Sequence, residues 1–210
     1  MPAEIDHIVI GCAGLDEGVA ALRKALGAPP VHFGAHSQMG THNALWSLGS
    51  CYLELISIDP DAAPPGRARW FGLDGTATQA RLHNGPALLT WVARVPDFSQ
   101  AKAQFGPVMS LTRDALRWQL TVPDDGEMPM EGCLPALIKW PDGSPTPTQT
   151  LSDSGLRLRS LHLPSLPALR AALPDFNTDQ PIRFGSQRGI KVVIERADGA
   201  RVEWDQQTAY

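Results

Sequence analysis

The sequence has few of the features that mark exported, membrane-bound or disulfide-stabilised proteins. It contains three cysteines, an odd number without CxxC spacing, which indicates reduced, buried thiols. No apolar run approaches the roughly 18 residues that a membrane span needs. The N-terminal segment MPAEIDHIVIGC is acidic, whereas a signal peptide begins with basic residues. We therefore expect a cytoplasmic protein without a membrane partner.

Charge of either sign is also sparse. Charged residues make up 19% of the 210-residue chain, and the formal net charge is −4. Lysine and arginine form no basic stripe, so we expect no nucleic-acid partner. The phosphate-binding patterns G-x-x-x-x-G-K-[ST] and G-x-G-x-x-G are missing, and so is the G-x-S-x-G elbow of hydrolases. The common signatures of nucleotide binding and serine hydrolysis are thereby excluded.

Glycine and proline, in contrast, are abundant, with 19 residues of each. This content predicts many turns and short elements, and it argues against a helical bundle or a solenoid. A hydrophobic fraction of 43% is sufficient for a folded core. Much of the glycine and proline lies in two segments, 59–66 and 141–148, which separate the chain into three parts.

Residues 1–60 have the pattern of one strand, one helix and three further strands. A helical face is formed by Leu15, Val19, Leu22 and Leu26. Asp16 and Glu17 lie at the start of this face and Gly27 follows it, as is typical of helix ends. The predicted strands cover residues 5–12, 31–35, 42–48 and 51–57.

The same order of elements recurs twice. YLEL at 52–55 resembles RVEW at 201–204, and the first helix resembles LPSLPALRAAL at 163–173. We predict a second unit over 85–148, a third over 149–210, and a linker or lid over 61–84. The strands predicted in these units cover residues 87–95, 108–112, 115–122, 134–140, 156–163, 181–185, 188–196 and 200–205.

Two polar side chains interrupt otherwise apolar strands of the first unit. Strand alternation places His7 on the same face as Ile5 and opposite to Asp6, while Glu54 shares the face of Tyr52. A lone carboxylate among apolar residues costs several kcal/mol unless it is paired, hydrogen-bonded or bound to a cation. The residues alone leave two interpretations open, a cation site and a hydrogen-bonded group at the mouth of a barrel.

The segments DHIVI and YLELI, with His7 and Glu54 at this spacing, resemble the vicinal oxygen chelate superfamily. GTHNALWSLGSCYLELI is similar to the narrower group of glyoxalase-like domain proteins, and LRWQLTVP followed by LPALIKW resembles their second unit. The resemblance covers about residues 1–140. It implies an α+β fold in which repeated βαβββ units form a cupped, barrel-like mixed sheet with the helices outside.

The resemblance also implies a function and a site. It implies an enzyme that binds a divalent metal ion (Zn, Ni, Mn or Fe) through His7 and Glu54 and acts on a small molecule with two neighbouring oxygens, as an isomerase, lyase or dioxygenase. Glu54 would also move a proton. The second unit places Thr90 and Leu137, both poor ligands, at the corresponding positions. In the third unit Glu203 is a candidate third ligand or catalytic base, provided that this unit faces the first.

Five further residues are candidates for substrate binding: His36, Thr41, His42, Asn43 and Trp118. Alternation separates His42 from Asn43, so that only one of the two faces the cup unless the strand begins with a bulge. We place His36 in a loop over the cup.

For several aromatic and basic residues, the sequence does not distinguish a structural role from a role in a binding site. Trp118 and Trp140 fit core packing or an apolar pocket. Trp70-Phe71 fits a lid or loop packing. Arg113 and Arg117 could meet an anionic substrate, but nothing in the sequence distinguishes them from other surface arginines.

Two alternatives to an enzyme stay open. The first is a metal-free module of the same fold that binds or sequesters a small hydrophobic or cationic ligand. The second is a scaffold with a vestigial site. An odd number of units leaves one without an obvious partner, so the third unit either caps the sheet or pairs across a homodimer.

Overall fold

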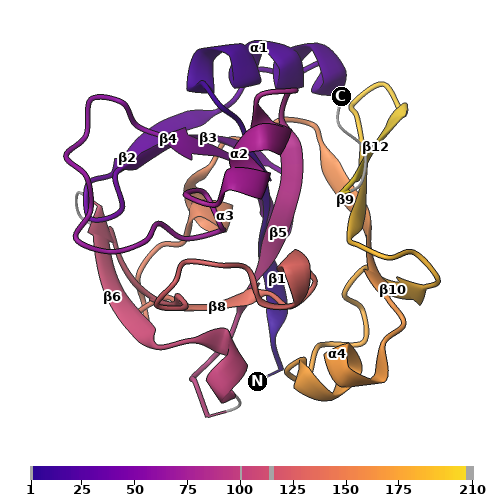
Figure 1. The fold of residues 1–210 in the computed structure, drawn as a ribbon. Coiled ribbons are helices and arrows are strands. Elements are labelled where there is room, and N and C mark those ends of the chain that lie inside the picture. The colour runs from indigo at the N-terminus through magenta and orange to yellow at the C-terminus, as the bar shows by residue number, and fades with distance from the viewer. Residues whose placement is uncertain (1, 100, 114–115, 207–210) are drawn as a thin grey trace.

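The computed structural model describes residues 2–99, 101–113 and 116–206. Residue 115 of the strand predicted over 115–122, and residues 207–210 of the predicted third unit, lie outside the described residues. The described chain forms an eight-stranded mixed sheet that curls into a nearly closed barrel, with a four-stranded sheet beside it (Figure 1). The α+β, barrel-like fold predicted from the sequence is thereby confirmed.

The elements follow the predicted order closely. The eight-stranded sheet contains β1 (Glu4–Gly11), β2 (His32–His36), β3 (Thr41–Ser47), β4 (Tyr52–Ile58), β5 (Ala87–Arg94), β6 (Val108–Arg113), β7 (Leu116–Thr121) and β8 (Ala136–Lys139). The four-stranded sheet contains β9 (Arg157–Pro164), β10 (Ile182–Gly185), β11 (Lys191–Glu195) and β12 (Arg201–Asp205). The helices are α1 (Leu15–Leu26), α2 (Thr76–Leu82), α3 (Pro147–Thr150) and α4 (Pro167–Ala172), with 3₁₀ turns η1 (Ala103–Phe105) and η2 (Pro129–Gly132). No helix in the described ranges is long and apolar enough to cross a membrane.

The barrel sheet consists of two halves with the same strand arrangement. Its order is β2-β3-β4-β1-β5-β8-β7-β6, with β1 and β5 antiparallel at the centre. In each half the first strand pairs in parallel with the last, β1 with β4 and β5 with β8. At the far edges, the backbone amide of Thr112 on β6 donates to Gln38 Oε1 beyond β2, at 2.8 Å. This bond connects the two edges and brings the inner faces of both halves around one interior.

Helix α1 illustrates how local sequence produces these elements. Asp16 and Glu17 lie in its first turn and basic residues in its last, an order that favours the helix dipole. Leu22 and Leu26 are buried on its inner face. Gly27 then adopts a left-handed φ of 71° and ends the helix, a conformation that glycine tolerates best.

The third unit keeps the βαβββ order of elements but not the strand pairing of the other two. Its sheet order is β10-β9-β11-β12, so that β9 pairs in parallel with the second strand of its unit and antiparallel with the third. Helix α4 has only six residues, and the strand that follows it, β10, pairs directly with β9. This sheet packs on the outer face of the barrel, where Leu161 and Ile194 share a core with Ile8 and Trp91.

The barrel interior contains a second core. Val9 of β1, Ile56 of β4, Leu120 of β7 and Ile138 of β8 contribute to it from the sheet. The segment 61–84, predicted as a linker or lid, contains helix α2 and packs Trp70, Phe71 and Leu73 into this interior core.

A β-bulge in β1 changes which side chains face the interior. Ile5 pairs with Ala93 of β5 and His7 with Val92, so that Asp6 has no register partner on that side. The extra residue reverses the alternation, because a bulge places two residues opposite one. Ile5 therefore belongs to the outer core, whereas His7 faces inward, and the prediction that they share a face is wrong.

Candidate functional site

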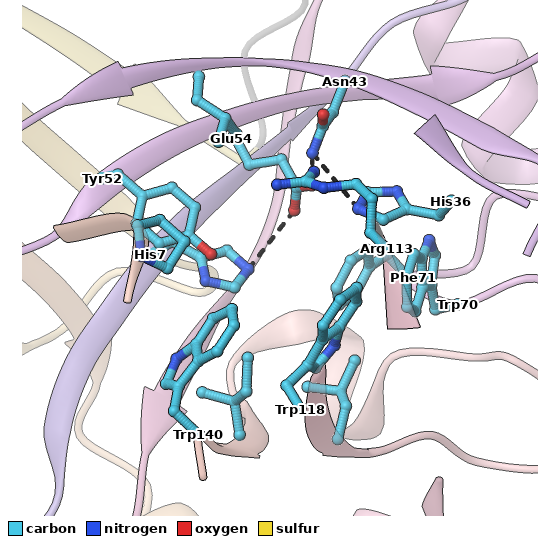
Figure 2. A pocket seen from close by; sticks show the side chains of 14 residues that line it. His7, His36, Asn43, Tyr52, Glu54, Trp70, Phe71, Arg113, Trp118 and Trp140 are labelled. Atoms are coloured by element: carbon cyan, nitrogen blue, oxygen red, sulfur yellow. Dashed lines mark hydrogen bonds and ion pairs between the residues drawn. The ribbon is translucent and has the colours of Figure 1, made fainter. Parts of the chain in front are cut away.

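A polar cavity opens inside the barrel (Figure 2). It contains about 440 Å³ of space not filled by atoms, part of it open to solvent. Both halves of the sheet and the segment 61–84 contribute to its walls. The lining residues are His7, His36, Asn43, Leu45, Tyr52, Glu54, Trp70, Phe71, Arg113, Trp118, Leu120, Ile138, Trp140 and Pro147.

The ring of His7 is held by Asp6 and Tyr52, and Trp140 in turn holds Asp6. Its Nδ1 donates to Asp6 Oδ1 at 2.8 Å, and Trp140 Nε1 donates to Asp6 Oδ2 at 2.9 Å. The ring of Tyr52 stacks on the imidazole with 4.5 Å between centroids. These contacts fix the tautomer and the orientation of His7, so that Nε2 is the nitrogen available to a ligand.

Glu54 meets His7 across two adjacent parallel strands. In the register of β1 and β4, His7 lies opposite Tyr52 and Val9 lies opposite Glu54. His7 and Glu54 are therefore diagonal neighbours on the inner face, and His7 Nε2 lies 3.4 Å from Glu54 Oε2. Both residues are buried, with exposed fractions of 4% and 5%. The resemblance to the vicinal oxygen chelate superfamily implies that these two residues converge.

A line of polar contacts continues from Glu54 along β3 and β2. Asn43 Nδ2 donates to Glu54 Oε1 at 2.5 Å and lies 3.5 Å from His36 Nε2. The other nitrogen of His36 lies 3.1 Å from Thr41 Oγ1. Asn43 Oδ1 is buried and has no hydrogen-bond partner among the described residues. The first half of the sheet thus carries a connected row of polar groups with one free oxygen acceptor.

Burial and neighbouring charges set the protonation states of this row. Burial alone would lower the pKa of His7, but Asp6 and Glu54 raise it to about 9. Burial alone would raise the pKa of Glu54, but His7 and Asn43 lower it to about 2. For His36 burial dominates and lowers the pKa to about 4. Without a bound cation, the site at neutral pH holds an imidazolium–carboxylate pair beside a neutral imidazole.

The second half of the sheet and the segment 61–84 supply aromatic walls. Trp118 and Trp140 lie 5.8 Å apart between ring centroids. Trp70 makes an edge contact with His36 at 4.9 Å, and Phe71 stacks on Trp70. Arg113, the last residue of β6, is the cation of this side of the cavity. The cavity therefore has one polar wall and one predominantly aromatic wall.

The structure brings most of the predicted site residues together. His7, His36, Asn43, Glu54 and Trp118 line the cavity. His36 is the buried end of β2 and does not lie in an overhanging loop, as the sequence interpretation had it. Thr41 lies behind the cavity wall and supports His36 through its hydroxyl.

Two predicted residues lie elsewhere. His42 does not line the cavity, because β3 alternates and directs Asn43 inward. Glu203 lies on β12 of the four-stranded sheet, where its exposed side chain forms an ion pair with Lys191 at 2.5 Å. The third unit packs on the outer face of the barrel, so the condition for Glu203 to join the site is not met.

The second unit offers no ligand at the positions that correspond to the first. Thr90 donates its hydroxyl to the carbonyl of Gly132 at 2.9 Å. Leu137 belongs to the outer core, and the inward residue of β8 is its neighbour Ile138. The inward position of β8 is therefore displaced by one residue from the predicted alignment.

Several contributors escaped the sequence interpretation. Asp6 reaches His7 only because of the bulge, which strict alternation does not anticipate. The sequence left Arg113 and Trp140 open between a site and a surface or core position, because they lie far along the chain from the first unit and carry no local motif. Tyr52 was marked only by sharing the face of Glu54, a signal that would have been sufficient to include it.

The sequence of this chain matches a known protein family. The sequence profile of a family described as "Glyoxalase-like domain" matches residues 5–173, most of the chain and all of the barrel. The chain belongs to the glyoxalase-like domain family. No curated protein matches its sequence significantly.

Solved structures support the fold of this glyoxalase-like domain protein. A hypothetical protein from Staphylococcus aureus aligns over 97% of this chain and 99% of its own, with 14% identity and a TM-score of 0.60. A methylmalonyl-CoA epimerase from Streptomyces coelicolor aligns over 69% of this chain and 100% of its own, at 22% identity and a TM-score of 0.40. Another, from Mycobacterium tuberculosis, aligns over 66% and 88%, at 18% identity and a TM-score of 0.42. The first similarity concerns the fold alone, and the two epimerase alignments bear on neither ligand nor reaction.

Proposed function

We propose that this glyoxalase-like domain protein is a divalent-metal-dependent enzyme that acts on a small molecule with two neighbouring oxygens. The proposal rests on the convergence of His7 Nε2 and Glu54 Oε2, 3.4 Å apart in a buried cavity. Isomerase, lyase and dioxygenase reactions all agree with such a centre.

The donor set fits a divalent ion. Nitrogen and oxygen ligands at about 2.0–2.1 Å from a tetrahedral ion stand about 3.4 Å apart, the separation found between His7 and Glu54. Asp6 accepts from the far nitrogen of His7, the usual support for a metal-binding imidazole. Imidazole and carboxylate together suit Zn, Ni, Mn or Fe. No group of three His, Cys, Asp or Glu side chains gathers within the described ranges, so the centre has two such ligands. The unpartnered Oδ1 of Asn43 is a further oxygen donor.

The roles of the residues follow from their protonation. A bound divalent ion supplies Lewis acidity, which stabilises negative charge on a substrate oxygen. His7 must be neutral to bind the ion, and Asp6 keeps the remaining proton on Nδ1. Glu54, a buried carboxylate beside His7, is suited to holding the ion. His36 lines the same cavity, and burial lowers its pKa, so its neutral imidazole would accept the substrate proton.

Elemental analysis tests the proposal on protein purified without chelators or metal-affinity steps. We expect about one equivalent of Zn, Ni, Mn or Fe, lost in His7→Ala and in Glu54→Ala. Glu203→Ala, which removes a carboxylate outside the cavity, is the matched control and should keep the metal. Absence of metal, together with no thermal stabilisation by any of the four added ions, would overturn the proposal.

A second candidate is a metal-free binding protein. The aromatic wall formed by Trp70, Phe71, Trp118 and Trp140 favours it, because such surfaces hold flat or cationic ligands without a metal. Ligand binding that persists after chelator treatment would favour this candidate over the enzyme.

A further inference from the structure

Arg113 reaches the cavity from the opposite half of the sheet. It is the last residue of the edge strand β6, yet it lines the same cavity as His7 and Glu54. Figure 2 shows its side chain pointing toward the wall that carries Asn43 and Glu54. This location distinguishes it from Arg117, an exposed residue of the same hairpin that does not line the cavity.

The backbone of β2 leaves room for the Arg113 guanidinium. Gly34 lies opposite Asn43 in the register of β2 and β3. A Cβ at Gly34 would collide with Nη1 of Arg113 and would stand 2.9 Å from Asn43 Oδ1. The guanidinium therefore packs directly on the backbone of β2 at Gly34, which has no side chain, and lies close to the unpartnered oxygen of Asn43.

The guanidinium of Arg113 has no acidic partner among the residues that the structure describes. Other arginines of the barrel are neutralised or hydrogen-bonded, such as Arg69 with Asp74 at 2.7 Å and Arg94 with Glu4. The side chain of Arg113 forms neither an ion pair nor a hydrogen bond with any described residue. A guanidinium presents a planar pair of N–H donors that matches a carboxylate, and it remains charged at all relevant pH values.

The formal charges of the site leave a place for one anion. Asp6 and Glu54 contribute two negative charges and Arg113 one positive charge. With a divalent ion and a neutral His7, the sum is one positive charge, which a monoanionic ligand would balance. The cavity contains about 440 Å³ of space not filled by atoms, part of it open to solvent, which suits a small-molecule ligand.

We propose that Arg113 binds the carboxylate of the substrate, and that the substrate class is small 2-oxo or 2-hydroxy carboxylic acids. One part of this proposal rests on the function proposed above, namely that the two neighbouring oxygens of the substrate lie at the His7–Glu54 centre. Arg113 is then the residue that selects acids over neutral molecules of the same shape.

The test uses two pairs of probes that differ in charge but hardly in shape: pyruvate with pyruvamide, and glycolate with glycolamide. Ligand-observed NMR titration of the full chain, as purified, gives the affinity ratio of acid to amide. We expect the wild type to prefer each acid by about tenfold or more, as is usual for a charged hydrogen-bonded pair. Arg113→Met should reduce the ratio to near one, because the charge that favours the acid is removed. Arg117→Met, the control, should keep the ratio.

Gly34→Ala provides an independent variant, because the added Cβ displaces the guanidinium without removing it. It should lower the ratio, and a ratio unchanged in both Gly34→Ala and Arg113→Met would overturn the assignment of Arg113. A wild type that binds acid and amide equally would also overturn it, with the function proposed above left intact.

His7→Ala separates the two proposals. If it abolishes binding of all four probes while Arg113→Met removes only the acid preference, both proposals are supported. If His7→Ala changes nothing while Arg113→Met removes the preference, the His7–Glu54 centre fails and Arg113 stands. If no probe binds the wild type, the assignment of Arg113 and of the acid substrate class fails, while the metal content described above decides the function proposed there.

Discussion

The two halves of the barrel sheet share one strand arrangement but carry opposite chemistry on their inner faces. Strands β1 to β4 present Asp6, His7, Asn43 and Glu54, whereas β5 to β8 present mainly aromatic and aliphatic side chains. At the central pair of strands, His7 faces Val92 directly. The backbone scaffold therefore does not dictate the site, since the same architecture supports a charged wall and an apolar one.

The difference has an energetic consequence. Buried charges are stable only when they are paired and hydrogen-bonded. In the first half these requirements are met internally, by the contacts of His7 with Asp6 and Glu54. Only Trp140 reaches Asp6 from the second half. The charged wall is thus a nearly self-contained network, and its members depend strongly on one another.

The largest effect is expected for His7→Val, which gives β1 the same residue as its partner Val92 on β5. The carboxylates of Asp6 and Glu54 then remain buried without their cation, and we expect a loss of about 3–5 kcal/mol in the free energy of unfolding. The triple variant Asp6→Asn, His7→Val, Glu54→Leu removes all three charges and should regain most of this loss. Urea denaturation of chelator-treated protein measures both. Equal stability of the single and triple variants would contradict the idea of a coupled network.

The pH dependence of stability tests the same network in the metal-free protein. The pKa of His7 rises from 6.5 to about 9 on folding, so its contribution is complete below pH 6.5 and is lost as pH rises toward 9. The pKa of His36 falls from 6.5 to about 4, so its contribution is present above pH 6.5 and is lost as pH falls toward 4. Glu54 adds a further loss between pH 4.5 and about 2. We expect maximal stability near pH 6.5.

Two variants test which histidine causes the loss of stability above pH 6.5 and which causes the loss below it. His7→Val should flatten the change between pH 6.5 and 9, and His36→Gln should flatten part of the change between pH 6.5 and 4. Denaturant midpoints across the pH range provide the measurement. A profile of His7→Val that is parallel to the wild type above pH 6.5 would show that His7 is not charged in the folded state.

Trp140→Phe probes the one bond that links the two halves at Asp6. It keeps an aromatic ring but removes the donor to Asp6 Oδ2, and we expect a cost of about 1.5–3 kcal/mol, typical of hydrogen bonds to charged groups. Trp118→Phe removes the same atoms from the same cavity without touching Asp6, and it should cost less. Thermal unfolding compares them, and equal costs would mean that the bond to Asp6 contributes little.

The smallest effect is expected outside the barrel. Glu203→Gln removes one partner of an exposed ion pair with Lys191, and such pairs contribute about 0–1 kcal/mol. Metal content and ligand affinity should stay at wild-type values. A loss of bound metal in this variant would restore Glu203 to the site and contradict the arrangement described above.

Much of the fold could be predicted because it is encoded in short-range patterns. The helical spacing of Leu15, Leu22 and Leu26 gave α1 with its observed bounds, and strand alternation correctly placed Glu54 inward with Tyr52. The strand pairing of the third unit could not be predicted in this way, because pairing depends on contacts between residues far apart in the chain. A βαβββ order of elements is compatible with more than one sheet order.

By itself, the sequence determined the order of elements, through local spacing and residue type, and the family resemblance, which in turn implied that His7 and Glu54 converge. Only the tertiary structure decided that Asp6 turns to His7 at a bulge, that Glu203 stays outside the barrel, and that Arg113 reaches the charged wall. The physical reason is the closure of the sheet. Bringing β6 beside β2 places a cation more than a hundred residues from His7 against Gly34, a neighbourhood that no segment of the sequence contains.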